Sequence, residues 1–167
     1  DRDGSLISNY DRNRKGFNIT LGRPESEYST NYITLKNRED NFVCYNEGPI
    51  NYANDPQYLK DNFGLTRSIT LSHVTDTRDN VFSTTEGARV LASAEFAGGI
   101  LSGDFDYKKF NFEDRHYFKV GHAQVVATRA TVGYATGSIP ENALFTAGGI
   151  DTLRGFRDDQ FEGKRLL

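Results

Sequence analysis

One arginine of this chain is framed by glycines in a way that could present its guanidinium at a fixed place. Residues 145–156 read Phe-Thr-Ala-Gly-Gly-Ile-Asp-Thr-Leu-Arg-Gly-Phe. The Gly148 and Gly149 pair permits close backbone approach or positive φ angles, and Gly155 lets the chain turn directly after Arg154. A guanidinium carries five donors in a planar fork that suits a carboxylate. The stretch therefore predicts binding chemistry from a loop, and the alternative is an ordinary solvated arginine.

The spacing of these residues resembles the signature loop of the outer-membrane barrel assembly superfamily, the bacterial surface antigens. The matching positions are Gly148, Gly149, Leu153, Arg154, Gly155 and Phe156. The resemblance implies that the loop folds back into a transmembrane barrel and that its Leu-Arg-Gly-Phe tip docks on the inner wall. It also implies that the acidic partners of Arg154 lie on later strands, beyond Leu167. A guanidinium inside a barrel needs such a partner, because its desolvation is otherwise uncompensated.

A second stretch, residues 76–87, resembles the Asp-x-Arg-Asp-x-x-x-x-Pro-x-x-Gly hairpin that links two adjacent barrel strands in the same family. The matching positions are Asp76, Arg78, Asp79 and Gly87. Thr84 or Thr85 stands where proline is usual, so the turn lacks the fixed φ that proline would give. We expect the charged residues to hold the hairpin by charge-assisted bonds to amides and to one another. The alternative is a solvated polar turn that contributes little to stability.

The other titratable residues give no pattern typical of an enzyme or a metal site. Four carboxylates alternate with Phe105 and Tyr107, as residues facing a barrel lumen would; they are Asp104, Asp106, Glu113 and Asp114. The histidines His73, His116 and His122 lack the spacing and companion glutamate of a zinc hydrolase. No serine lies in a Gly-x-Ser-x-Gly elbow. We therefore expect no catalytic residue, no metal and no cofactor.

Composition removes several other classes of function. The formal charge of −3 over 167 residues gives no electrostatic footprint for nucleic acid. Cys44 is the only cysteine, which excludes an internal disulfide. No run approaches the roughly 20 apolar residues of a transmembrane helix. A mean hydropathy of −0.62 still suits a barrel wall, because lipid-facing and lumen-facing residues alternate along its strands.

Six segments with a period of two are expected to form antiparallel strands. They are residues 15–23, 28–38, 64–75, 88–98, 103–115 and 122–135. The polar, turn-rich residues 39–62 predict a long loop between the second and third strands. In the fifth segment Phe105 and Tyr107 share one parity while Phe110 and Phe112 share the other, which predicts a bulge near Lys108 and Lys109.

Alternation gives each strand one apolar face, which is expected to face lipid in a complete barrel. Its predicted members are Phe17, Ile19, Leu21, Ile69, Leu71, Val90, Phe96, Val126 and Val132. Gly133 falls on the opposite face. Because it has no side chain, it is expected to leave room for a loop packed against the inside.

These patterns predict an all-β fold, an antiparallel meander of about six strands that ends in the inward-folding loop 136–167. Six strands do not close a transmembrane barrel, since the smallest single-chain ones have about eight. The resemblance implies that residues 1–167 form the middle of a sixteen-stranded barrel, with the POTRA domains and the remaining strands absent. Open strand edges are then expected to make the isolated chain self-associate.

The resemblance implies a role in outer-membrane protein assembly, in which barrel proteins are folded and inserted into the bacterial outer membrane. The implied partners are unfolded outer-membrane proteins, accessory assembly lipoproteins and the lipid bilayer, and no enzymatic step is expected. One alternative within the superfamily is a two-partner secretion transporter that exports a polypeptide. An alternative of a different class is a soluble β-sandwich that binds a ligand through the Arg-Gly-Phe loop.

Overall fold

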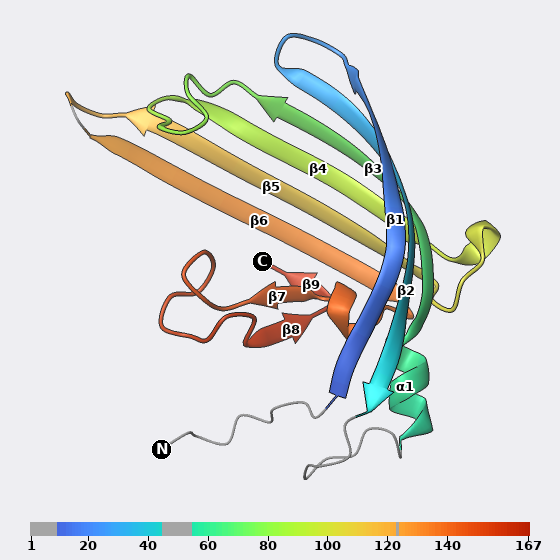
Figure 1. Cartoon of the computed structure of the whole chain (residues 1–167). Helices are drawn as coiled ribbons and strands as arrows, with labels where there is room; N and C mark the ends of the chain where they lie inside the picture. Colours follow the sequence, from blue (N-terminus) through green and yellow to red (C-terminus); the bar gives the residue numbers. More distant parts are fainter. Residues whose placement is uncertain (1–9, 45–54, 123) are drawn as a thin grey trace.

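The computed structural model describes residues 10–44, 55–122 and 124–167, and these form one strongly curved antiparallel sheet with a short hairpin beside it (Figure 1). Six long strands follow one another in chain order. They are β1 (Tyr10–Pro24), β2 (Ser29–Cys44), β3 (Gly64–Asp76), β4 (Gly87–Ala97), β5 (Tyr107–Lys119) and β6 (Val125–Gly137). Each strand pairs with the next, so the expected meander is confirmed, and β1, β2 and β3 are longer than the sequence pattern indicated.

The expected bulge in the fifth strand is wrong. Every residue of β5 from Tyr107 to Lys119 has a partner on β4, on β6 or on both, without a register shift. The change of parity has another cause. Phe105 precedes the strand and packs with Tyr107 in a small buried cluster on one face, whereas Phe110 is exposed on the other. Aromatic residues therefore occupy both faces of a regular strand.

The expected loop over residues 39–62 is also partly wrong. Strand β2 continues to Cys44, and residues 56–62 form a helix, α1 (Pro56–Asn62). The Asp55 carboxylate caps this helix by accepting from the amides of Gln57 and Tyr58, and Pro56 follows in the first turn. This is the usual chemistry of a helix start. Residues 45–54 of the expected loop lie outside the described residues.

The segment after β6 is not a plain loop, because it contains several short elements. They are the 3-10 helix η3 (Glu141–Ala143) and the strands β7 (Phe145–Ala147), β8 (Phe161–Gly163) and β9 (Arg165–Leu166). Strands β7 and β8 pair with each other, and β9 joins the large sheet beside β6. The segment contacts β2 through Asn142 and lies against β6 through Phe145. It therefore lies within the concave side of the curved sheet.

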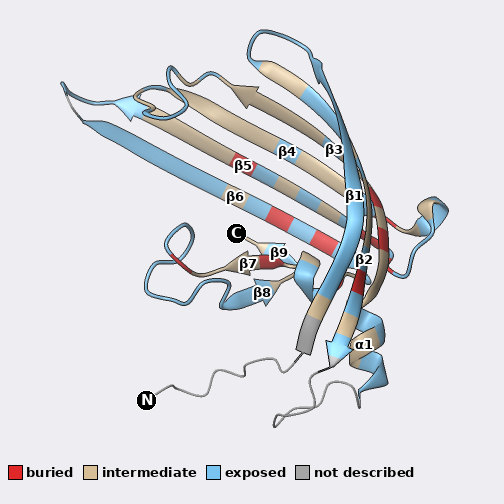
Figure 2. Ribbon diagram, viewed as in Figure 1, coloured by how far each residue is buried: buried red, intermediate tan, exposed pale blue. Residues whose placement is uncertain are grey.

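Buried residues gather at the end of the sheet where this segment packs, as Figure 2 shows. The buried apolar side chains are Ala97, Phe105, Tyr107, Ala135 and Phe145. Apart from β7 and β8, the described strands belong to a single sheet, so no second large sheet covers its convex face. The alternative of a β-sandwich is therefore wrong.

In the part of the chain that is described, no helix has the length and apolar character needed to cross a membrane. A second 3-10 helix, η2 (Gly99–Leu101), lies between β4 and β5.

Candidate functional site

The convex face of the sheet carries a broad band of apolar side chains, and it also holds polar residues such as Asn31 and Asp114. The register aligns apolar side chains across all six long strands, from Ile19 opposite Leu35 on β2 to Phe112 opposite Val132 on β6. All nine residues predicted to share this face do share it. In the register, odd-numbered residues of β1 to β3 lie in the same rows as even-numbered residues of β4 to β6, and the nine residues follow this rule. Seven of the nine are also among the exposed large apolar side chains: Phe17, Ile19, Leu21, Leu71, Phe96, Val126 and Val132. An exposed apolar surface of this extent marks contact with a membrane or a partner.

The concave face is polar and charged, and one of its rows is unusual. The register places Arg89, Arg115 and Arg129 directly opposite one another on β4, β5 and β6. Like charges in such a row repel one another. The mostly buried carboxylate of Glu113 compensates them, with distances of 3.4 Å to Arg89, 2.8 Å to Arg115 and 2.7 Å to Arg129. Of the four carboxylates that the sequence grouped together, Glu113 lies on this face and Asp114 on the other.

Two further carboxylates bind cations across the concave face. Glu95 lies 2.6 Å from the Lys36 ammonium and accepts hydrogen bonds from the hydroxyls of Ser68 and Tyr107. Asp40 is almost fully buried and lies 2.9 Å from the guanidinium nitrogens of both Arg14 and Arg38. Each carboxylate has its charge matched, as a carboxylate removed from bulk water requires.

The chain after β6 is held against this charged face. An added Cβ at Gly133 would lie 2.6 Å from the ring of Phe145, so only glycine permits the observed packing. The expected close approach of a loop at Gly133 is thus confirmed. Farther along, Arg129 donates to the backbone carbonyl of Asp151 at 2.9 Å. The guanidinium of Arg129 therefore links the arginine row to the loop that carries the signature residues.

The signature loop forms a compact tip. Gly148, Gly149 and Gly155 all have positive φ, at 131°, 91° and 94°. The Thr152 hydroxyl lies 2.7 Å from both the amide and the carbonyl of Gly148, and the Gly149 amide donates to the Phe156 carbonyl at 3.3 Å. The tip is thus closed by bonds of its own backbone and of Thr152, and Leu153 is exposed on it.

Arg154 projects from this tip into solvent. It is exposed, and its Nε donates a hydrogen bond to the Ile150 carbonyl at 3.4 Å. No carboxylate lies within ion-pair distance of it among the residues that the structure describes. The docking of Arg154 on a barrel wall therefore stays a prediction. The neighbouring Phe156 packs its ring at 5.1 Å from that of Phe161 on β8.

The second motif builds a well-ordered connection between β3 and β4. Arg78 donates from Nε and Nη2 to the two carboxylate oxygens of Asp76, at 2.8 and 2.7 Å. Asp79 accepts from the amide and the hydroxyl of Thr85, at 2.9 and 2.6 Å, and from the amide of Glu86. The hydrogen bonds from Thr85 lower the pKa of Asp79 from its usual 3.8 to about 2.

The turn of this hairpin is fixed without proline. The Thr84 hydroxyl donates to the Asn80 carbonyl at 2.7 Å, and the Asn80 side chain accepts from the amides of Phe82 and Ser83. Gly87 has φ of 102°, and an added Cβ would lie 2.3 Å from the Thr77 carbonyl oxygen. Side-chain bonds thus replace the restriction that proline would supply, and glycine is required where the chain returns to β4.

Comparison with known families places these features in context. The Omp85 superfamily domain matches residues 1–166. The chain belongs to the Omp85 superfamily. Its signature loop and its hairpin are therefore parts of an Omp85 barrel domain, whose sheet is open here.

One curated relative and one solved structure are especially informative. The outer membrane protein assembly factor BamA of Nitratidesulfovibrio vulgaris (strain Hildenborough) is 29% identical over 157 residues, which cover 90% of this chain and 19% of that protein. The crystal structure of BamA from Haemophilus ducreyi lacking POTRA domains 1–3 superposes with a TM-score of 0.73 at 19% identity. That match covers 90% of this chain and 31% of the other. This Omp85 chain thus spans about a fifth of its curated relative.

Several residues that hold the loop were not identified from the sequence. Asp40, Asn62, Lys109 and Asn142 all contact the segment after β6 or belong to it. For Lys109 a signal was present, since it shares the inward parity of Tyr107. The other three could not be recognised, because their contacts join residues far apart in the sequence.

Proposed function

We propose that this chain is the central part of the barrel of an outer-membrane protein assembly factor, located in the bacterial outer membrane. The observation that carries the proposal is that one Omp85 sheet has two chemically different faces. The convex face is apolar, and the concave face holds the Arg-Gly-Phe loop against a charged wall. The relative from Nitratidesulfovibrio, whose name is that of an assembly factor, supports the same activity.

The physical logic of the activity is the satisfaction of backbone hydrogen bonds. An unfolded strand entering lipid must pair all its amides and carbonyls, because the bilayer core offers no water to do so. A barrel with a seam that can open offers an edge on which the strand can form. The proposed partners are therefore unfolded outer-membrane proteins, the lipid bilayer and accessory assembly lipoproteins. The activity breaks no covalent bond and needs no cofactor.

The connections between strands support one orientation in the membrane. At one end of the sheet they span residues 25–28, 77–86 and 120–124. At the other end they span 45–63, 98–106 and 138–164, and they include α1 and the signature loop. Transmembrane barrels carry short turns on the periplasmic side and longer loops outside. The end with α1 is accordingly the proposed outer end, and the hairpin of Asp79 is periplasmic.

Depletion of the protein in its own host tests this function against secretion. For an assembly factor, we expect the levels of many unrelated outer-membrane barrel proteins to fall together in quantitative proteomics. For a two-partner secretion transporter, the barrel proteins would persist and a single secreted polypeptide would be lost. The second outcome would replace the proposed function with the secretion alternative.

A further inference from the structure

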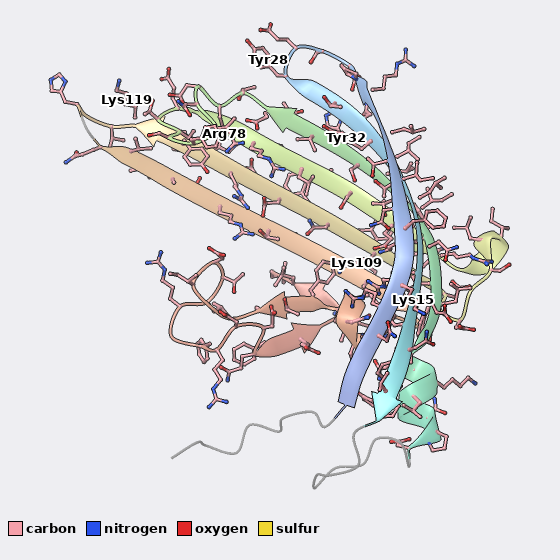
Figure 3. All side chains as sticks on the ribbon, in the orientation of Figure 1. Lys15, Tyr28, Tyr32, Arg78, Lys109 and Lys119 are labelled. Carbon is pink, nitrogen blue, oxygen red and sulfur yellow. The ribbon has the colours of Figure 1, made fainter. Side chains whose placement is uncertain are left out.

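The root of the signature loop is held by contacts that involve none of the signature residues. After β6 the chain passes over the concave face, and residues 141–145 touch α1, β2, β5 and β6 in turn. Figure 3 shows Lys109 lying between β5 and this passing segment. The contacts fall into three groups, on Asn142, on Glu141 and on the segment from Ala143 to Phe145.

Asn142 is held at both ends of its side-chain amide by β2. Its Nδ2 donates to Asp40 Oδ2 at 3.2 Å, and its Oδ1 accepts from Arg38 Nη2 at 3.3 Å. Asp40 has a relative exposure of 1%, so this bond forms away from bulk water. A hydrogen bond to a charged group contributes more than one between neutral groups.

Glu141 is held by the short helix α1. The side chain of Asn62, which is buried, accepts from the Glu141 amide at 2.9 Å and donates to the Tyr58 carbonyl. The Tyr58 hydroxyl donates to the Glu141 carboxylate at 3.1 Å. One turn of α1 thus contacts both the backbone and the side chain of the first residue of η3.

Lys109 makes the remaining contact with its ammonium group. Nζ donates to the Ala143 carbonyl at 2.6 Å, lies 3.5 Å from the Leu144 carbonyl, and lies 4.3 Å from the centre of the Phe145 ring. These carbonyls belong to the last residue of η3 and the residue after it, where the last turn of a helix leaves acceptors without partners. A lysine is suited to this place because its compact charge carries three donors on a long stem.

The cross-strand neighbour of Lys109 shows that this contact is selective. The register places Glu95 directly opposite Lys109, yet Glu95 binds Lys36, Ser68 and Tyr107. No carboxylate lies within ion-pair distance of Lys109 in the described part of the chain. Its charge is directed at the backbone of the loop root, and Phe145 beneath it fills the space left by Gly133.

We propose that Lys109 is a positioning residue for the signature loop, at the centre of a root clasp formed by Asp40, Asn62, Lys109 and Gly133. The root clasp fixes where the chain leaves the wall, and so where Arg154 can reach, before any contact of Arg154 itself. The importance of this placement rests on the function proposed above. The geometry of the root clasp is independent of that function.

Hydrogen exchange of the full-length protein tests the root clasp directly. Lys109→Met keeps most of the apolar stem and removes the donors. We expect amides in residues 141–147 to exchange about tenfold faster than in the parent, because the bond lost is one to a charged group. Lys109→Arg retains charge and donors and should restore much of the protection. Lys108→Met is the matched control, since Lys108 is exposed on the opposite face, and it should leave the exchange unchanged.

Asn142→Ala provides a second variant, which changes the loop alone and leaves the strands intact. It should also speed exchange in residues 141–147, while the hairpin 77–86 serves as an internal reference. Parent-like exchange in both Lys109→Met and Asn142→Ala would overturn the root clasp. Growth of a depletion strain reports separately on function. Faster exchange with normal growth would uphold the root clasp and count against the functional role proposed for the loop.

Discussion

Arg129 and Arg154 both belong to the concave side of the sheet, but their surroundings differ. Arg129 donates to Glu113 from two nitrogens and to the Asp151 carbonyl from a third. Arg154 is exposed and makes a single long bond within its own loop. A guanidinium with most donors uncommitted is available to a carboxylate elsewhere, and its planar fork favours a bidentate partner. Arg129 thus holds the loop, whereas Arg154 is presented by it.

The first prediction follows from that difference. In the full-length protein we expect Arg154→Lys to impair barrel assembly substantially, because lysine retains the charge and loses the fork. Arg154→Ala should impair assembly at least as much. The measurement is complementation of a depletion strain, with equal abundance of the variants verified in the outer membrane. Arg165→Gln is the control, as this residue is not framed by glycines. Parent-like growth with Arg154→Ala would refute the role given to this residue.

A second prediction concerns the pH dependence that Asp79 gives to the hairpin. Its pKa is lowered to about 2 in the folded protein, so its bonds stabilise the fold fully above pH 3.8 and are lost as the pH falls toward 2. The stability difference between the parent and Asp79→Ala should therefore be constant above about pH 4 and shrink between pH 4 and 2. Urea unfolding of the full-length protein in detergent measures it. A difference that persists unchanged at pH 2 would contradict the assignment.

Each long strand places apolar side chains on one face of the sheet and mostly polar side chains on the other, because successive residues point to opposite faces. On β3, for example, Leu71 lies in the apolar row with Ile33 and Ala94, while Ser72 lies on the concave face with Tyr32 and Ser93. The same alternation runs through β1 to β6, so the curvature of one sheet creates an apolar outside and a polar inside. The hairpin at 77–86 and the root clasp then lie at opposite ends of the strands.

The third prediction tests this alternation on neighbouring residues. Leu71→Arg should cost about 2–4 kcal/mol of stability in a bilayer, because it places a charge near the middle of the apolar band. Ser72→Arg, one residue along the same strand, should cost much less, since it faces the polar side. Urea unfolding of the full-length protein in lipid vesicles gives both values. Equal costs would remove the assignment of the convex face to lipid, as would a water-accessible spin label at Leu71.

Across the molecule, the strands and their faces could be predicted from the sequence, because alternation is a local signal. The prediction from sequence was wrong where the same local pattern is compatible with two different structures. The Asp-Pro pair at residues 55–56 lies in the stretch predicted as a loop, although it also begins a helix, and the aromatic residues of β5 predict a bulge although they occupy both faces. The root clasp could not be predicted, because Lys109 and Ala143 meet only once the sheet has curved.

The last prediction concerns the edges of the curved sheet. Among the strands that the structure describes, β1 has a neighbour on one side only, and β6 pairs with β9 at Gly133 and Tyr134. Both outer edges thus present rows of backbone donors and acceptors, and such edges seek partners. We therefore expect the isolated 167-residue chain to associate edge to edge in detergent-free buffer. Light scattering across a concentration series should show species larger than the 18.8 kDa monomer, and detergent should reduce them by covering the apolar convex face. A monodisperse monomer in plain buffer at every concentration would show that the edges and the apolar face are covered in another way. It would count against the assignment of the edges to barrel pairing and of the apolar face to lipid.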